Sequence, residues 1–114
     1  MRERDVERAL VRAVQNRGGI CPKWVSPGLD GVPDRIVMLP GGRIGFVELK
    51  APGERPRALQ IARMRQIGRL GYKCCVCDRV ELIEAILCEI EGERDGIHEE
   101  GPDRQGFEML PGQV

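Results

Sequence analysis

Two apolar segments joined by a glycine turn limit the folds open to this chain more than any other feature. Residues 34–39 and 43–50 flank Pro40-Gly41-Gly42, and such a short, glycine-containing link predicts a β-hairpin. Both segments carry apolar residues on both of their faces, as in Ile36-Val37-Met38-Leu39. Strands of this kind lie within a covered sheet, so the hairpin predicts a sheet with helices packed against it.

Helical periodicity on both sides of the hairpin supplies the covering layers. Apolar residues recur at helical spacing over 3–17, which ends at Gly18-Gly19, and over about 56–70, which begins at Pro56 and ends at Gly71. A third helix is expected after residue 78. Its predicted N-cap is Asp78, with Glu81 completing a capping box.

Short strands are expected at 23–25 and 73–77, so the predicted order is α-β-β-β-α-β-α. This order indicates an α/β fold with a central mixed sheet flanked by helices. The strand at 73–77 holds Cys74, Cys75 and Cys77. The five cysteines lack zinc spacing, and we expect them to be small buried residues in a reducing compartment.

Charge is divided unequally along the chain. The 114 residues carry 18 basic and 18 acidic side chains, yet residues 1–91 have a net charge of +4 and residues 92–114 one of −4. We expect 1–91 to form one domain and the acidic, glycine-rich 92–114 to be a mobile tail. Neither a membrane-spanning run nor a signal peptide is evident, which predicts a cytoplasmic protein without membrane contact.

The hairpin brings two carboxylates together. With Gly41 at the centre of the turn, Asp34 faces Glu48 across the strands, and Lys50 points the same way as Glu48. Opposed carboxylates repel each other and lose hydration, a cost that a bound cation would offset. Oxygen ligands that leave room for water and a phosphate suit Mg²⁺ or Mn²⁺. An exposed Glu-Lys ion pair after a Pro33-Asp34 turn is the structural alternative.

The combined pattern resembles the PD-(D/E)XK nuclease superfamily and, within it, the virus-type replication-repair nuclease (VRR-NUC) domain. The likeness extends from about Glu3 to the strand at 73–77. It rests on Gly31-Val32-Pro33-Asp34-Arg35-Ile36, Gly42-Arg43, Phe46-Val47-Glu48-Leu49-Lys50-Ala51 and Gln60. The resemblance implies the α-β-β-β-α-β core of restriction endonucleases and a free-standing phage-type member, acting in a host cell.

The resemblance also implies a set of site residues. A metal would be bound by the carboxylates of Asp34 and Glu48 and by the main-chain carbonyl of Leu49, with Lys50 as the catalytic lysine. Gln60, on the next helix, would lie close to the metal or its water. A surface glutamine without that role is the alternative.

A glutamate from the first helix is a further ligand implied by the resemblance. Glu3 and Glu7 lie four residues apart on one helical face, so either one fits the pattern. We expect Glu7, because it lies next to the buried stripe, whereas Glu3 is in the first turn, which frays. Glu3 is the alternative.

Basic residues near these positions are candidates for phosphate contacts. A solvated helix face explains the arginines of the second helix equally well. Trp24 is expected in the core rather than as a platform for stacked bases. The candidates are Lys23, Arg35, Arg55, Arg57, Arg65 and Arg69.

The function implied by the resemblance is metal-dependent hydrolysis of phosphodiester bonds in DNA. Phage-type members resemble junction-resolving endonucleases that act as homodimers on branched, Holliday-junction-type DNA, and Ile61 and Met64 are candidates for the dimer surface. Two alternatives stay open: a module that binds nucleic acid or assembles without cutting, and an RNA-directed nuclease. The complete set of Asp34, Glu48 and Lys50 argues against the first.

Overall fold

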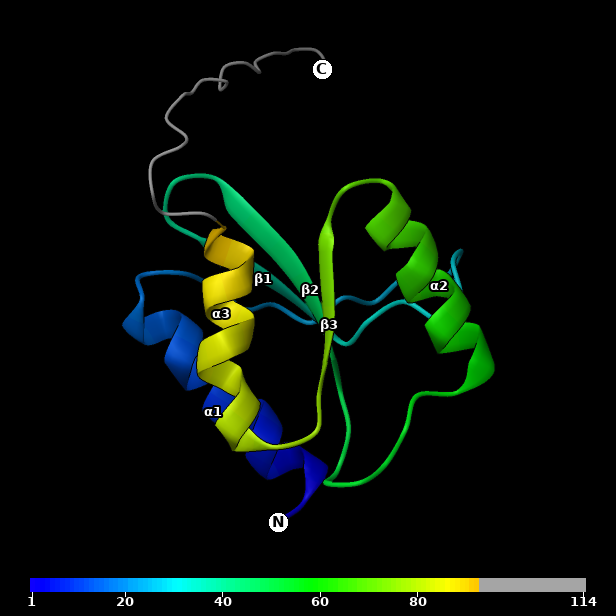
Figure 1. Ribbon diagram of the computed structural model, residues 1–114, viewed down its shortest axis with the longest axis horizontal. Coiled ribbons are helices and arrows are strands. Elements are labelled where there is room, and N and C mark those ends of the chain that lie inside the picture. Colours follow the sequence, from blue (N-terminus) through cyan, green and yellow to red (C-terminus); the bar gives the residue numbers. More distant parts are fainter. Residues whose placement is uncertain (93–114) are drawn as a thin grey trace.

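A three-stranded sheet lies between helices in the computed structural model, which describes residues 1–92 (Figure 1). The expected tail, apart from Gly92, lies outside the described residues. The elements are α1 (Glu3–Asn16), β1 (Arg35–Leu39), β2 (Arg43–Leu49), α2 (Ala58–Arg69), β3 (Lys73–Cys77), a 3₁₀ helix (Val80–Leu82) and α3 (Ile83–Glu91).

The sheet is mixed, as predicted, with the order β1-β2-β3. β1 and β2 are antiparallel, and β2 and β3 are parallel. The β1–β2 register pairs Arg35 with Val47 and Leu39 with Arg43, which confirms Gly41 as the centre of the turn. Continued by one residue, this register places Asp34 opposite Glu48.

The prediction that both hairpin strands lie inside a covered sheet is wrong for β1. Only β2 is central, and it is buried from Gly45 to Leu49. β1 is an edge strand on which Met38 is 38% exposed. The predicted strand at 23–25 is also absent, and two isolated bridges, Ile20–Met38 and Lys23–Arg35, take its place beside β1. Pro22 lies between these bridges and has no amide hydrogen to extend a ladder.

The core lies on one face of the sheet, beneath α1 and α3 (Figure 1). α1 contributes Val6, Leu10 and Val14, which recur every fourth residue and are 0% exposed. α3 packs against β2 at Gly45, where an added Cβ would lie 2.5 Å from a side-chain carbon of Ile90. The glycine therefore sets how closely α3 approaches the sheet. α2 lies on the opposite face and contributes one buried apolar residue, Ile67.

The third helix begins differently from the prediction. Arg79 rather than Asp78 is the N-cap, no side chain caps the turn, and a 3₁₀ turn precedes α3. The Asp78 carboxylate instead accepts hydrogen bonds from Arg79 and, at 3.3 Å, from the amide of Gly53. This contact ties the segment after β2 to the end of β3.

The cysteines are free thiols, and the expectation that they are buried holds for only some of them. Cys21 and Cys77 are buried, Cys74 and Cys75 are half-buried, and Cys88 is exposed on α3. Cys74 and Cys75 are on β3, an edge strand of this sheet, which explains their partial exposure. Within residues 1–92, no helix is long and apolar enough to cross a membrane.

Candidate metal centre

Asp34 and Glu48 occupy the end of the sheet at which β1 begins and β2 ends. Asp34 is half-buried, and its Oδ2 accepts a 2.8 Å hydrogen bond from the amide of Leu49. This bond spans the two strands and orients the Asp34 carboxylate beside the main chain of Leu49. Glu48 is only 1% exposed, because β2 is the central strand and α2 covers this face.

The two oxygens of Glu48 have different surroundings. Oε2 accepts a 2.7 Å hydrogen bond from Nε2 of Gln60 and lies 3.2 Å from Nζ of Lys50. Oε1 is buried and has no hydrogen-bond partner among the described residues. A buried carboxylate oxygen without a partner is costly, about 1–3 kcal/mol or more. It therefore marks a position that a cation could satisfy.

The electrostatics of Glu48 agree with this interpretation. Burial raises the pKa of the Glu48 carboxyl, and the negative charge of Asp34 raises it further. The Lys50 ammonium acts in the opposite direction and offsets part of the effect. A divalent cation would favour the ionised form of both carboxylates at once.

Gln60 is buried and held at both ends of its side-chain amide. Its Oε1 accepts a 2.9 Å hydrogen bond from the amide of Arg57, so its Nε2 is directed at Glu48. The structure thus places Gln60 beside the candidate site rather than on the surface. The same bond explains why α2 begins at Ala58, two residues later than predicted, with Arg57 as its N-cap.

Glu3 and Glu7 differ in their surroundings. The Glu7 carboxylate forms an ion pair with Arg35, with Oε2 2.8 Å from Nη2 and 2.9 Å from Nε. Burial and the charge of Asp34 raise the pKa of Glu3, and Lys50 lowers it, so Glu3 lies within the electrostatic range of the site. Glu7 is thus engaged by Arg35, whereas Glu3 interacts with the charges of the site. Which of the two glutamates serves the metal stays a prediction.

The candidate phosphate contacts fall into two groups. Arg35 is half-buried and donates to the carbonyl of Cys21 at 2.6 Å as well as to Glu7, so it has a structural role in this fold. Trp24 is half-buried and packs on Phe46 with ring centroids 5.0 Å apart, outside the hydrophobic core, so the prediction of a core residue is met only in part. The other five candidates are exposed: Lys23, Arg55, Arg57, Arg65 and Arg69.

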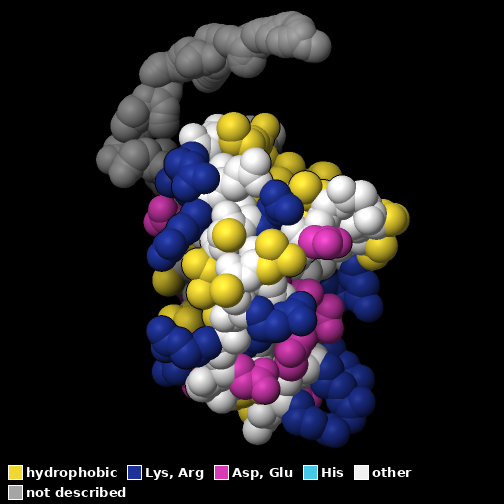
Figure 2. All heavy atoms as spheres, turned by 90° about the vertical axis from the view of Figure 1, so that its right-hand side faces the viewer, with side chains coloured by type: hydrophobic (Ala, Val, Ile, Leu, Met, Phe, Trp, Pro, Cys, Tyr) yellow, Lys and Arg dark blue, Asp and Glu magenta, His cyan; other side chains and the backbone are white. Residues whose placement is uncertain are grey.

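The surface on the α2 side shows how the charges are distributed (Figure 2). Acidic side chains gather in the lower part of this view, at the end of the molecule where α1 begins and the chain leaves β2. Lys and Arg side chains lie on both sides of them. Basic groups therefore flank the acidic end on which the candidate site lies.

The donor set fits a hard divalent cation. Within residues 1–92, no three His, Cys, Asp or Glu side chains converge as a self-sufficient metal cluster. Two carboxylates with a neighbouring main-chain carbonyl suit Mg²⁺, which keeps several waters and uses only one or two protein carboxylates. The unpartnered Oε1 of Glu48 is the observation that makes these residues fit the ion.

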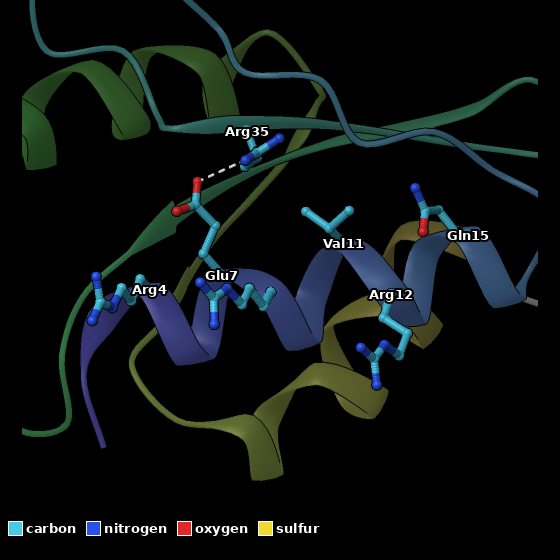
Figure 3. Close-up of a pocket in the computed structure, with 7 residues that line it drawn as sticks. Arg4, Glu7, Val11, Arg12, Gln15 and Arg35 are labelled. Atoms are coloured by element: carbon cyan, nitrogen blue, oxygen red, sulfur yellow. Dashed lines mark hydrogen bonds and ion pairs between the residues drawn. The ribbon is translucent and has the colours of Figure 1, made fainter.

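Three arginines of α1 are absent from the predicted set. Arg4, Arg8 and Arg12 line an open groove on the outer side of α1, which also contains the Glu7–Arg35 pair (Figure 3). Their four-residue spacing was the signal in the sequence, because it places all three on one side of a helix.

A mixed sheet that presents an aspartate opposite a Glu-x-Lys strand end is the arrangement expected of a nuclease, and two comparisons identify that class of protein. No family model matches the chain. It is 48% identical over 82 residues to "Putative nuclease p44" of Acyrthosiphon pisum secondary endosymbiont phage 1, which covers 72% of this chain and 88% of that protein. A solved VRR_NUC domain matches with a TM-score of 0.70 and 26% identity, covering 75% of this chain and 92% of that one.

The chain belongs to the VRR-NUC nuclease family. The resemblance seen in the sequence is therefore confirmed, as is the α/β fold.

Proposed function

We propose that this nuclease is a Mg²⁺- or Mn²⁺-dependent phosphodiesterase that cuts DNA. Its active site would contain Asp34, Glu48 and Lys50. The observation that carries the proposal is the buried, unpartnered Oε1 of Glu48. The charge of Asp34 acts on the same carboxylate. Asp34, Glu48 and the main-chain carbonyl of Leu49 would hold the ion, and Glu3 is the favoured fourth donor.

The chain's own residues prepare the site. The Leu49 amide orients Asp34, and Gln60 orients Glu48, so both carboxylates are fixed before substrate arrives. A divalent ion held there supplies Lewis acidity toward a phosphate and toward water. Lys50 is held 3.2 Å from Oε2 of Glu48, which keeps its ammonium group at the site. That ammonium would orient the attacking water and neutralise charge on the phosphate.

We further propose that the substrate is branched DNA and that the protein acts on it as a homodimer. Symmetric cutting of two strands requires two sites, and the junction-type specificity rests on the family resemblance alone. Ile61 and Met64 are half-buried, so they offer little surface to a second copy. Among residues 1–92, the most exposed large apolar side chains are Val25, at 78%, and Met1 and Leu70, each at 71%. The mass of the full chain in solution tests the dimer.

Cleavage assays test the proposed function. The full chain is incubated with four-way junction, flap, duplex and single-stranded DNA, and with RNA, each with Mg²⁺, Mn²⁺ or EDTA. We expect cleavage of DNA with either metal, none in EDTA, and none by Glu48→Gln. Glu81→Gln, an exposed glutamate of the 3₁₀ turn, is the charge-matched control and should cut normally.

Two outcomes would contradict the proposal and favour another function. Binding of these substrates without cleavage of any of them would favour the non-cleaving module. Cleavage of RNA alone would favour the RNA-directed nuclease.

A further inference from the structure

An open groove of about 500 Å³ runs along the outer side of α1 (Figure 3). Arg4, Arg8 and Arg12, spaced four residues apart on α1, line it. The Glu7–Arg35 ion pair lies on the side toward β1. With four arginines and one glutamate, the groove has a net charge of +3.

Within residues 1–92, the side chains of the three helix arginines form no ion pair or hydrogen bond with a neighbouring side chain. Each is exposed, and none forms an ion pair with a carboxylate within residues 1–92. Arg17, at the end of the same helix, differs because it is held between Glu84 and Glu91. Like charges four residues apart on a helix destabilise it by about 0.2–0.5 kcal/mol per pair. Asp5 attracts Arg4 and offsets part of this cost, and an anionic ligand in the groove would offset the rest.

The groove begins where the proposed site ends. Glu3, which lies in electrostatic range of Asp34 and Lys50, directly precedes Arg4. Asp34 and Arg35 are consecutive, so their side chains point to opposite faces of the sheet, with Arg35 directed toward Glu7 on α1. α1 begins at the end of the molecule at which the chain leaves β2 (Figure 1). A DNA arm that leaves the site toward α1 would therefore reach the groove at Arg4.

The dimensions fit a nucleic-acid backbone. From Arg4 to Arg12 the helix rises about 12 Å, at 1.5 Å per residue. At about 3.4 Å per nucleotide along one strand, this length corresponds to three or four phosphates. Guanidinium groups bind phosphate oxygens through paired hydrogen bonds, and such contacts fix the position of a duplex without reading its sequence.

We propose that this groove binds the sugar–phosphate backbone of the DNA arm that extends from the cleaved bond. The inference rests on the proposed function, because the arm is defined relative to the nuclease site. It adds a second basic surface on α1, which positions the substrate independently of its sequence.

Binding of fluorescent four-way junction DNA to the full chain tests the groove. Affinity is measured by anisotropy in EDTA over a range of salt concentrations, so the assay does not depend on cleavage. The variant is Arg8→Gln/Arg12→Gln. Arg4 is left intact because it adjoins Glu3. The control, Arg43→Gln/Lys73→Gln, removes the same charge at the opposite end of the sheet, where β2 and β3 begin.

Each lost phosphate contact should reduce the slope of log K against log salt by about 0.9. The groove variant should therefore lose about 1.8 from the slope and bind up to about sixtyfold more weakly at 0.1 M salt, with the control close to wild type. Arg8→Lys/Arg12→Lys should restore most of the slope, because it keeps the charge. Thermal melts should show the Lys variant to be as stable as wild type and the Gln variant to be no less stable, because the Gln variant removes the like-charge pairs.

Equal slopes and affinities for the Gln variant and the control would overturn the inference, as would a loss of binding with an unchanged salt slope. Failure of the proposed function has a different signature. In that case the wild type does not cleave in Mg²⁺ or Mn²⁺, while the binding comparison still decides the role of the groove. When both hold, the Gln variant should have a raised KM and a retained kcat, because Arg8 and Arg12 lie outside the catalytic set.

Discussion

Replacing Glu48 by glutamine should separate a metal site from a structural ion pair. The two side chains have nearly the same shape. The glutamine oxygen can still accept from Gln60 and Lys50 at the position of Oε2, and its amide group would occupy the position of Oε1. The change removes a negative charge that is 1% exposed and that the charge of Asp34 opposes.

The expected energies follow from these contacts. Removing the charge relieves the desolvation of the carboxylate and its repulsion by Asp34. Two effects oppose this gain: the amide N–H groups at the Oε1 position are still buried without a partner, at about 1–3 kcal/mol, and the charged contact with Lys50 is weakened. We therefore expect the metal-free variant to equal the wild type or to exceed it by about 1 kcal/mol. For a domain of this size, that gain raises Tm by about 4–8 °C. A cation at one hundred times its Kd should stabilise only the wild type, by about 2.7 kcal/mol.

Thermal melts of both proteins in EDTA and in Mg²⁺ or Mn²⁺ measure both effects, with Glu81→Gln as the control. The reasoning would be refuted if Glu48→Gln lost about 3–5 kcal/mol in EDTA, the usual cost of removing one partner from a buried ion pair. A metal-dependent rise in Tm that is the same in both proteins would also refute it.

Three further predictions concern the same site. Lys50→Met should retain the metal-dependent rise in Tm. Its cleavage rate should fall by a factor of about 10²–10⁴, the usual contribution of a group that assists proton transfer. Loss of the rise in Tm would instead show that Lys50 is needed for the metal to bind. Glu3→Gln should reduce cleavage with little change in Tm. Glu7→Gln breaks the ion pair with Arg35, so it should reduce the free energy of unfolding by about 1 kcal/mol and lower Tm accordingly. The reverse pattern would identify Glu7 as the residue that serves the metal site. The pKa of Glu48 in the folded protein is raised above its ordinary value of 4.5, so ionisation of this carboxyl destabilises the fold. In EDTA, the wild type should therefore lose stability relative to Glu48→Gln as the pH rises from about 4.5 through that raised pKa. A pH-independent difference between the two melts would contradict that cause.

The sequence was sufficient to predict the parts of this fold that local rules determine. The glycine turn fixed the register that places Asp34 opposite Glu48, because a hairpin loop sets which residues pair. The stripe of Val6, Leu10 and Val14 predicted α1 to within one residue of its end. These features depend on neighbours in the chain.

The features that the sequence could not predict depend on distant contacts. The ion pair of Glu7 with Arg35 joins residues 28 positions apart, and no local pattern in the helix reveals which glutamate is engaged. Asp78 accepts from Gly53, 25 positions away, instead of capping a helix. The exposure of β1 depended on the strand order, which hydrophobic patterning does not specify.

The central claim is that a divalent cation binds between Asp34 and Glu48, and the most direct test is a crystal structure with Mn²⁺ and its anomalous difference map. We expect a peak about 2.0–2.2 Å from an Asp34 oxygen, from Oε1 of Glu48 and from the carbonyl of Leu49, with water as the remaining ligands. A map without a peak there at saturating Mn²⁺, or with its peak at other residues, would contradict the account.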